Sequence, residues 1–392
     1  MSRIPSVVLA VLLTTATLSV AAVGGVAGAA APSQNASQTQ SHSADAAAYQ
    51  GTHVAFNTSS DAVTDYRVGG ATLFDDVSVA SQSDHDSRAG LGADAALSSV
   101  VNLSGLGLEL GVETETRADL SLEGSSSGGI SAHDSERGIL TVAAGDDDRY
   151  VEADLASGVT AESDGDGRVA IDGGERDGAF VVVGDGEVAV NEDGNVVADL
   201  EGDSTLVFRS YGDGERDDEA RAQEDLIADG EATAEVYAEV REDGERVADV
   251  ATYGQDIAVE ASADAEDRLE VTAERAADEG TIVIVGASDA VLETVGSAED
   301  LAVTVDGDVA TEASSYSELE GAIGEEPRYM VVQESDAAAS ADVLVAVDHF
   351  SEREIAVQNA DDVEDADDGM SGFGPVVALA ALALSAAARV RS

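Results

Sequence analysis

The sequence predicts a mainly β protein, an antiparallel sandwich or meander with a few short helices. Three observations carry this prediction. Short apolar runs recur between residues 139 and 210, Gly- and Asp-rich turns separate them, and alternate positions are apolar over residues 106–122. Regular spacing of this kind is typical of strands joined by tight turns. A β-solenoid is the alternative architecture, although the runs follow no constant repeat period.

The composition indicates the solvent in which such a fold would be stable. The chain has 80 acidic residues against 19 basic ones, every one of them Arg, and a formal net charge of -61. Self-repulsion would destabilise a compact state in dilute buffer, whereas at molar salt the Debye length is about 3 Å and the repulsion is screened. Lys, whose long apolar stem favours aggregation in high salt, is absent. We therefore expect a halophilic source.

The composition also limits the function classes. High charge with 4% aromatic residues is typical of disordered chains, but 44% of the residues are hydrophobic and recur in ordered patterns. An acidic surface repels polyanions, which excludes nucleic acid as a partner. The sequence has no Cys, and therefore no disulfide, thiolate nucleophile, cysteine zinc site or lipoprotein-type anchor.

Residues 1–29 are predicted to be a secretory signal peptide. Arg3 gives a positive start, an apolar run follows at 7–13, and small residues at 27–29 suit a cleavage site. An uncleaved N-terminal membrane helix is the alternative. Residues 30–48, rich in Ser, Gln and Ala, are expected to form a flexible spacer. Export would expose three candidate N-glycosylation sequons, which begin at Asn35, Asn57 and Asn102.

Residues 49–212 are predicted to form a β-rich domain. The alternation from Leu106 to Leu122 indicates one strand, or two joined at a bulge, with one buried face. The turns at 184–186 and 193–194 are hairpin signals, so the strands that flank each of them should be antiparallel neighbours. The apolar runs expected to be strands are 139–142, 169–171, 180–183, 188–190, 196–200 and 206–208.

Residues 213–232 are predicted to be an acidic helical linker, in which Ala220, Leu226 and Ile227 allow one weak helix. Residues 233–360 follow as a β-rich α+β section. A hairpin is expected at 235–250, and a helix at 314–323, where Ser315 and Glu318 have the spacing of a capping box.

The C-terminal end predicts attachment to a membrane. An acidic hinge at 361–372 precedes a largely apolar stretch, and Arg389 and Arg391 follow it. About 20 uncharged residues suffice to cross a hydrocarbon layer of roughly 30 Å, and terminal Arg favours the cytoplasmic side. Residues 373–392 are therefore the expected anchor, with the rest of the chain outside. A buried C-terminal core helix is the alternative.

Gly372, Phe373, Gly374 and Pro375 stand directly before that apolar stretch. With the basic end, this layout resembles the PGF-type C-terminal sorting signal of haloarchaeal surface proteins. The resemblance implies that an archaeosortase removes the helix and joins the new C-terminus to a membrane lipid. Ser371 stands where the family has Pro, whereas Gly372 and Phe373 match.

No pattern in the sequence predicts a catalytic, cofactor or metal site. Residues 124–128 match the Gly-x-Ser-x-Gly motif of hydrolases, but their position between expected strands favours a loop. The Asp-rich loops at 164–167 and 191–195 do not complete the spacing of an EF-hand. The histidines outside the spacer share no ligand-type spacing; they are His53, His85, His133 and His349.

Together these features predict a membrane-anchored protein at the cell surface of a halophilic archaeon, on the extracellular face of the membrane. We expect a structural or binding role without catalysis or cofactor, with surface-layer proteins as candidate partners. Two alternatives stay open. One is a surface-bound hydrolase, since 80 acidic residues can hide a catalytic pair. The other is a ligand-capture protein that supplies a transporter.

Overall fold

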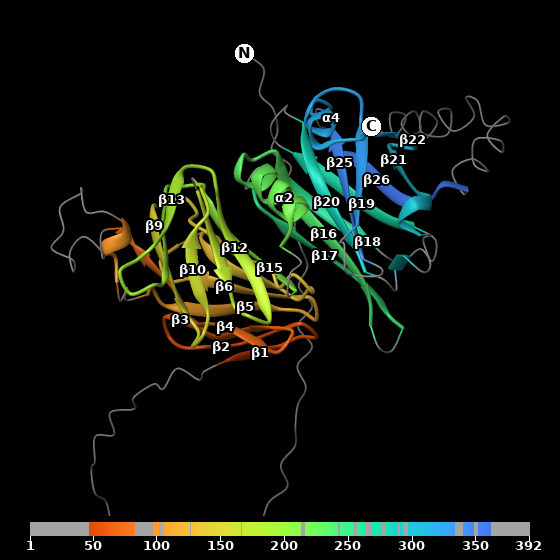
Figure 1. The fold of residues 1–392 in the computed structure, drawn as a ribbon. Coiled ribbons are helices and arrows are strands. Elements are labelled where there is room, and N and C mark those ends of the chain that lie inside the picture. Colours follow the sequence, from red (N-terminus) through yellow and green to blue (C-terminus); the bar gives the residue numbers. More distant parts are fainter. Residues whose placement is uncertain are drawn as a thin grey trace, which may run out of the picture. The chain divides into compact units, whose positions relative to one another are not determined.

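The computed structural model describes residues 47–82 and 97–361, except 102, 104, 126, 166, 213–215, 242–243, 255–256, 263–267, 276–279, 289–290, 293–296, 334–339 and 349–351. This part of the chain is mainly β, and its four sheets form two sandwiches (Figure 1). The predicted fold class is confirmed. Within the described residues the sheets are largely antiparallel and do not coil as a solenoid.

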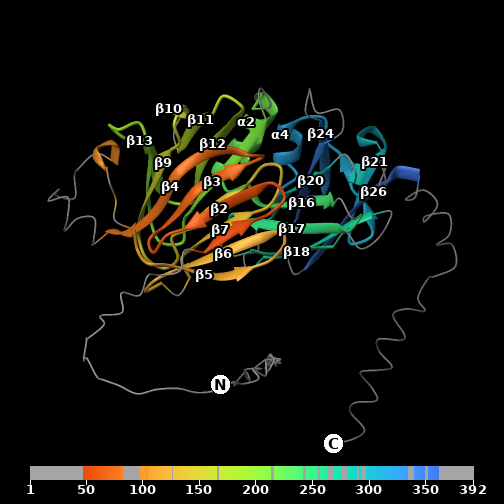
Figure 2. The same ribbon diagram turned by 90° about the horizontal axis from the view of Figure 1, so that it is seen from below.

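The first sandwich consists of two sheets that are entirely antiparallel (Figure 2). One has the spatial order β1 (Ala48–Gln50), β2 (Val54–Thr58), β3 (Ala62–Val68), β4 (Ala71–Ser81), β9 (Arg149–Leu155), β14 (Val196–Leu200) and β13 (Gly186–Val190). The other has the order β10 (Thr160–Ser163), β11 (Arg168–Asp172), β12 (Arg176–Val183), β15 (Thr205–Gly212), β8 (Leu140–Ala143), β7 (Gly129–His133), β6 (Arg117–Leu122) and β5 (Leu108–Glu113).

The second sandwich follows in the sequence and includes two parallel strand pairs, β16 with β20 and β23 with β24. Its larger sheet has the order β17 (Arg246–Thr252), β16 (Ala232–Val240), β20 (Thr281–Ala287), β25 (Ala341–Val347), β24 (Arg328–Gln333) and β23 (Thr311–Glu312). Its smaller sheet has the order β18 (Ile257–Ser262), β19 (Arg268–Arg275), β26 (Arg353–Asn359), β21 (Leu301–Val305) and β22 (Asp308–Val309).

Two α-helices and two 3-10 helices complete the described elements: η1 (Leu97–Ser99), α2 (Asp218–Ala228), η2 (Ala298–Asp300) and α4 (Tyr316–Glu320). The expected capping residue begins α4, because Ser315 Oγ accepts the N–H of Glu318. The Glu318 carboxylate reaches back to Ser314 N at 2.9 Å. The Ser315 half of the predicted capping box is therefore present, whereas the Glu318 carboxylate bonds to Ser314, one residue before the N-cap, and not to Ser315.

The core of the first sandwich is organised around a row of aromatic rings. Tyr49, Phe56, Tyr66 and Phe74 come from four neighbouring strands, and their consecutive ring centroids are 5.5, 6.2 and 5.8 Å apart. The row continues to Phe208 in the facing sheet, 4.7 Å from Phe74. Such contacts add stabilisation beyond the area that they bury. The row thus ties the two sheets together across the sandwich.

The core of the second sandwich is almost wholly aliphatic. Its buried side chains are Ala, Val, Leu and Ile, and Tyr329 is the one aromatic residue among the described members of that cluster. In β25, Val343, Val345 and Val347 face this core, whereas Leu344 and Ala346 on the opposite face belong to a third apolar cluster. A strand that is buried on both faces reads as a continuous apolar run.

The third cluster lies between the two sandwiches and will be called the middle layer. It joins the outer face of the β12 and β15 sheet to the outer face of the β16 and β25 sheet, with α2 between them. Ala220, Leu226 and Ile227, the apolar residues that allowed a weak helix in the sequence, are buried on α2. Gln223 and Glu224 of the same helix are also buried, which the sequence did not predict.

Two predictions about turns were wrong. Thr114 and Thr116, placed on the buried face of one strand, lie in a turn that reverses the chain between β5 and β6. The turn at 184–186 does not join antiparallel neighbours, because β12 and β13 belong to different sheets. Gly184, with φ of 91°, is instead the corner where the chain crosses the sandwich. The turn at 193–194 does join an antiparallel pair, β13 and β14.

Among the described residues, no helix is both long enough and apolar enough to span a membrane. The predicted signal peptide and the predicted anchor lie outside the described residues.

Candidate functional site

The strand β15 turns a charged residue away from the first core and toward the second sandwich. Leu206 and Phe208 point into the aromatic core. Since successive residues of a strand face opposite sides, Val207 and Arg209 point into the middle layer. Arg209 has an exposed fraction of 0%. A guanidinium buried this deeply requires partners, because an unpaired buried charge is costly.

Those partners come from three elements. Arg209 Nε lies 2.9 Å from Glu235 Oε2 on β16, Nη1 donates to Tyr211 Oη at 3.0 Å, and Nη2 donates to Gln223 Oε1 at 2.9 Å. Tyr253 Oη donates to the same Glu235 oxygen at 2.6 Å. Burial opposes the charge of Arg209, but attraction to Glu235, together with Tyr211, Tyr253 and Asp342, outweighs it and holds the pKa of Arg209 above the usual value. Burial, followed by the Glu235 charge, raises the pKa of Tyr253.

Arg137, between β7 and β8, extends this network. Its Nη2 donates to Asp342 Oδ2 at 2.5 Å, and its Nε lies 3.4 Å from Glu235 Oε1. Its Cζ lies 5.4 Å from the centroid of the Tyr211 ring. Asp342 Oδ2 also accepts from Gln223 Nε2 at 2.8 Å. The first sandwich, α2 and the second sandwich are therefore joined by one continuous set of charge-assisted hydrogen bonds.

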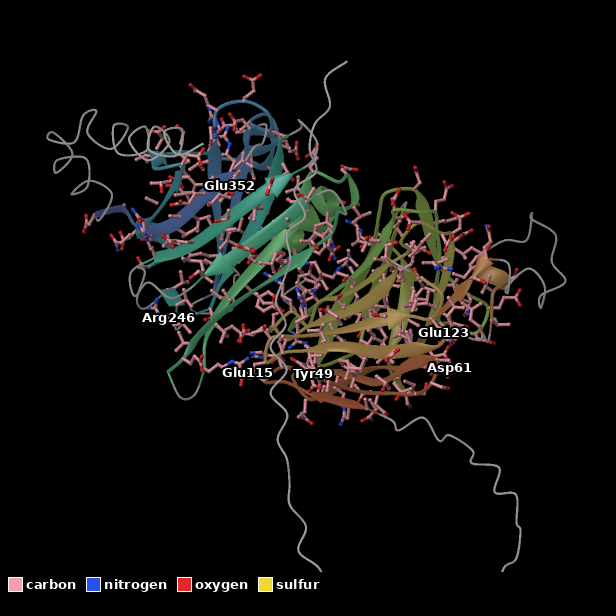
Figure 3. All side chains as sticks on the ribbon, turned by 180° about the vertical axis from the view of Figure 1, so that it is seen from behind. Tyr49, Asp61, Glu115, Glu123, Arg246 and Glu352 are labelled. Carbon is pink, nitrogen blue, oxygen red and sulfur yellow. The ribbon has the colours of Figure 1, made fainter. Side chains whose placement is uncertain are left out.

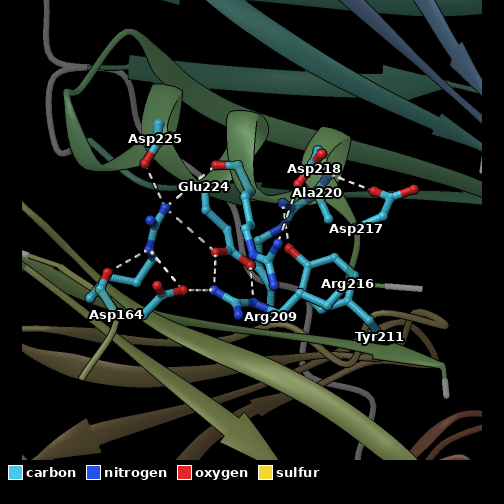
Figure 4. A network of polar contacts seen from close by, with 11 residues as sticks. Asp164, Arg209, Tyr211, Arg216, Asp217, Asp218, Ala220, Glu224 and Asp225 are labelled. Carbon is cyan, nitrogen blue, oxygen red and sulfur yellow. Dashed lines mark hydrogen bonds and ion pairs between the residues drawn. The ribbon is translucent and has the colours of Figure 1, made fainter. Parts of the chain in front are cut away.

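A second network lies beside α2 (Figure 4). Glu224 is fully buried and accepts from Arg216 in a bidentate manner, Nε to Oε1 at 2.9 Å and Nη2 to Oε2 at 2.7 Å. Arg216 Nη2 also donates to Asp164 Oδ2, and Arg168 Nη1 to Asp225 Oδ1, each at 2.5 Å. The hydrogen bond from Arg216 lowers the pKa of Asp164, against the opposing effect of burial. Asp164 therefore anchors its loop to α2.

Both of the histidines that the structure describes contact the second sandwich from the first. His53 Nε2 lies 3.2 Å from Glu239 Oε2, and His133 Nδ1 lies 3.5 Å from Asp249 Oδ2. Burial lowers the pKa of His53, but the hydrogen bond to Glu239 and nearby carboxylates raise it by more, so the net shift is upward. Burial raises the pKa of Asp249, but the contact with His133, together with hydrogen bonds from the Val250 N–H and Tyr237, lowers it by more, so the net shift is downward.

The loop that carries His53 is held by a single carboxylate. Asp134 accepts the backbone N–H groups of residues 52–54 at 2.7 to 2.8 Å. A Cβ at Gly51 would lie 2.3 Å from Asp134 Cγ, so glycine is required for this close approach. His53 is thereby fixed against the second sandwich by groups of the first.

The turn between β5 and β6 adds a further contact between the sandwiches. Arg241 Nη2 donates to Glu115 O at 2.7 Å, and Tyr237 Oη lies 3.1 Å from Thr116 O. Tyr49 Oη donates to the same Glu115 carbonyl at 3.3 Å (Figure 3). The turn that the sequence analysis had placed within a strand is thus part of the contact between the two sandwiches.

A pocket of about 270 Å³ opens beside the middle layer, between the two sandwiches. Its wall includes the His53 and Glu239 pair and the Arg137 and Asp342 pair. The wall also includes serine, glycine and alanine residues and the charged residues Glu136, Arg176 and Glu235. Ser135 and Tyr211 of the first sandwich and Gly286 and Ser288 of the second also line the pocket.

Of the predicted site residues, Asn57 is the one that the structure describes. It lies on β2, and its Nδ2, the atom that a glycan would join, donates to Asp65 Oδ2 at 2.9 Å. A glycan at Asn57 would replace one of the two hydrogens that this nitrogen carries. The other predicted residues lie outside the described part of the chain; they are Asn35, Asn102, Gly372, Phe373, Gly374, Pro375, Arg389 and Arg391.

As far as the structure describes them, the hydrolase-like and Asp-rich motifs of the sequence do not form the sites that they resemble. The segment 124–128 joins strand β6 to strand β7, where a nucleophile elbow would need a helix to follow. In the loop at 191–195, Asn191 Oδ1 accepts the N–H groups of Asp193 and Asn195 at 3.0 and 2.9 Å. Within the described residues, no group of three or more His, Asp or Glu side chains is arranged to hold a metal ion.

The fold and the site define a class, a mainly β protein of two sandwiches joined through a buried polar layer. No family model matches the sequence, and no curated protein is similar to it. Among solved structures, a mutant of a family 81 glycoside hydrolase from Clostridium thermocellum is weakly similar. It shares 9% identity at a TM-score of 0.32, over 80% of this chain and 35% of that one. The chain thus spans about a third of that structure's length.

Proposed function

We propose that this protein is an exported cell-surface protein, held at the outer face of the membrane by its C-terminal tail, with a structural or binding role rather than a catalytic one. The observation that carries the proposal is the order of segments after β26: acidic residues, an uncharged apolar stretch, and Arg389 and Arg391. That order favours an arrangement with the two sandwiches outside the membrane and the basic end inside. The signal peptide at residues 1–29 supplies the route of export.

The middle layer supports the non-catalytic part of the proposal. The ionisable groups that converge there are engaged with one another, Arg209 with Glu235 and Arg137 with Asp342. A catalytic acid or base must be able to exchange protons with a substrate. Residues held in buried ion pairs instead fix the two sandwiches to each other. A protein module exposed to the medium needs such a fixed arrangement. The pocket favours ligand capture as the second candidate function.

Deletion of residues 372–392 tests the anchor. We expect the truncated protein in the culture medium and the full-length protein in the membrane fraction, because no other segment of the mature chain is apolar enough to hold it. A matched control replaces Arg389 and Arg391 by Gln, which leaves the apolar stretch intact. If the truncated protein stays in the membrane fraction, anchoring by this tail is wrong.

Mass spectrometry of the membrane-extracted C-terminus tests the processing that the sorting-signal resemblance implies. Cleavage near Gly372 and Phe373 would yield a shortened, lipid-modified C-terminus. Replacement of both residues by Ala should then preserve the full tail. A wild-type peptide that ends at Ser392 would contradict processing and leave a simple helical anchor.

A further inference from the structure

The pocket between the sandwiches has the position and size of a site for a small molecule. Pockets that bind ligands occur preferentially where two compact modules meet, and usually measure roughly 300 to 1,000 Å³. This one, at about 270 Å³, lies near the lower limit. Its lining comes from both sandwiches: Ser135, Arg137 and Tyr211 belong to the first, and Glu239 and Asp342 to the second.

Most of the charged side chains on the pocket wall already have partners, and Arg176 donates to Ser210 Oγ and to the Glu136 carbonyl. Arg137 lies between Glu235 and Asp342, and Glu239 contacts His53. A charged ligand would have to separate one of these pairs and leave a partly buried charge without its partner, which is unfavourable. A neutral ligand avoids that cost. It can donate to the remaining lone pairs of the carboxylates, since each ionised carboxylate has about four acceptor positions.

Two serine hydroxyls on the wall lack partners. Ser135 is 3% exposed, and among the described residues neither Ser135 Oγ nor Ser288 Oγ has a hydrogen-bond partner. Buried polar groups nearly always have one, so each such exception requires an explanation. A hydroxyl both donates and accepts, and Ser135 and Ser288 come from opposite sandwiches. A ligand that carries several hydroxyl groups could satisfy both at once.

The rest of the wall suits the carbon skeleton of such a ligand. Ala238, Ala287 and Ala341 line the pocket with methyl groups, and Gly286 presents no side chain. We propose that this pocket binds a small neutral polyol of about the size of a monosaccharide. Its hydroxyls donate to the paired carboxylates and bond with Ser135 and Ser288, and its C–H faces lie against the alanines. The proposal does not depend on export or anchoring.

Isothermal titration calorimetry of the full-length protein in molar salt tests the ligand class. The neutral probes are D-glucose, D-galactose and D-mannose, and the charged probes of similar size are D-glucuronate and D-glucosamine. We expect saturable binding of at least one neutral sugar, with weaker binding of both charged ones. Tighter binding of a charged probe, or no saturable binding of any neutral sugar, would overturn the proposal.

Substitutions locate the binding. Gly286→Leu fills the pocket from β20, where an added Cβ meets Asp342 Oδ1 at an ordinary 3.4 Å, and should abolish binding. Ala258→Leu, at an exposed position of β18, is the matched control and should bind normally. Ser135→Ala and Ser288→Ala should each weaken binding roughly three- to tenfold without loss of thermal stability, since neither removes a hydrogen bond within the protein. Normal affinity in both serine variants and in Gly286→Leu would place the ligand elsewhere and refute the site.

Discussion

The cores of the two sandwiches and the middle layer between them are buried to a similar degree but differ in chemistry. The two cores consist of apolar side chains; the first includes a row of aromatic rings among its aliphatic residues, and the second is almost wholly aliphatic. The middle layer combines apolar residues with Arg209, Glu235 and Asp342, all within 4% exposure. Apolar cores tolerate replacement by side chains of similar volume, whereas a buried ion pair depends on both partners. The first kind of contact supplies stability, and the second selects one arrangement of the two sandwiches.

Removal of salt should reduce the stability of the folded chain more than any substitution below. It acts on the many exposed carboxylates, and the chain has too few arginines to pair with all of them as it does with those of the middle layer. The Debye length rises from about 3 Å at 1 M to about 30 Å at 0.01 M, so repulsion within a chain of net charge -61 is no longer screened. Circular dichroism should show loss of β structure on dialysis to millimolar salt. Sucrose at matched osmolality should fail to prevent it. A full β spectrum in millimolar salt would contradict this expectation.

The substitution Arg209→Met tests the middle layer directly. It leaves Glu235 buried without its main partner and should reduce the free energy of unfolding by about 3–5 kcal/mol. The double variant Arg209→Met, Glu235→Met removes both charges and should recover much of that loss. Urea denaturation in molar salt measures both. The interpretation fails if the double variant is no more stable than the single one.

A matched test in an apolar core is Leu120→Ala. Leu120 is 2% exposed within the first core, so the cavity should cost about 2–5 kcal/mol. Leu120→Met keeps most of the volume and should cost less than about 1.5 kcal/mol. The same urea denaturation applies. If the two variants were equally destabilised, the first core would not tolerate a side chain of similar volume, and the contrast with the middle layer would fail.

A smaller effect is expected from Asp76→Asn on the face of β4. Burial, followed by the charges of Asp154, Asp61 and Glu152, raises the pKa of Asp76 from 3.8 to about 6. The folded state therefore holds this proton more tightly, and the stability so gained at low pH is lost as the pH rises through about 6. Asp76→Asn should raise the unfolding temperature at pH 7.5 and change it little at pH 4.

The matched control for this variant is Asp308→Asn, at an exposed position of β22, which should show no such pH dependence. An unfolding temperature of Asp76→Asn equal to that of the wild type at both pH values would contradict the prediction.

The smallest effect should come from His53→Gln. The pKa of His53 is raised in the folded state, so protonated His53 contributes stability that is fully present below its usual pKa and is lost as the pH rises through the folded value. The contribution should be below about 1 kcal/mol, because the pair is partly exposed. The dependence of stability on pH above 6.5 should be flatter in the variant than in the wild type. If stability depended on pH with the same slope in both proteins, protonation of His53 beside Glu239 would not contribute to stability.

Short-range patterns predicted much of the fold. Alternation and turn residues identified runs that became β8, β11, β12, β13, β14 and β15, and the capping box located α4. The middle layer escaped prediction because its partners are far apart: Arg137 and Asp342 are separated by 205 residues. One signal was available. Arg209 interrupts an apolar run of β15 on a face that would otherwise be buried, and a charge there implies a buried partner.

The turn predictions failed for a related reason. The Gly184 turn has the local chemistry of a hairpin, but local chemistry does not decide whether the next strand joins the same sheet or the facing one. Which sheet the next strand joins depends on where the apolar residues after the turn can be buried, against one sheet or the other. Likewise, the apolar alternation continues in phase through Thr114 and Thr116, so it conceals the reversal between β5 and β6.

The separation of Arg137 from Asp342 also fixes an order of events during synthesis. The first sandwich, complete once β15 has emerged, has every strand of both its sheets. Arg209 then waits for β16, and Arg137 waits for β25, more than a hundred residues later. Until β16 has emerged, both guanidinium groups lack Glu235, and until β25 has emerged Arg137 still lacks Asp342. Chains that stop before β16 would therefore expose the unpaired guanidinium groups of Arg137 and Arg209 on the outer face of the first sandwich, on an otherwise acidic protein.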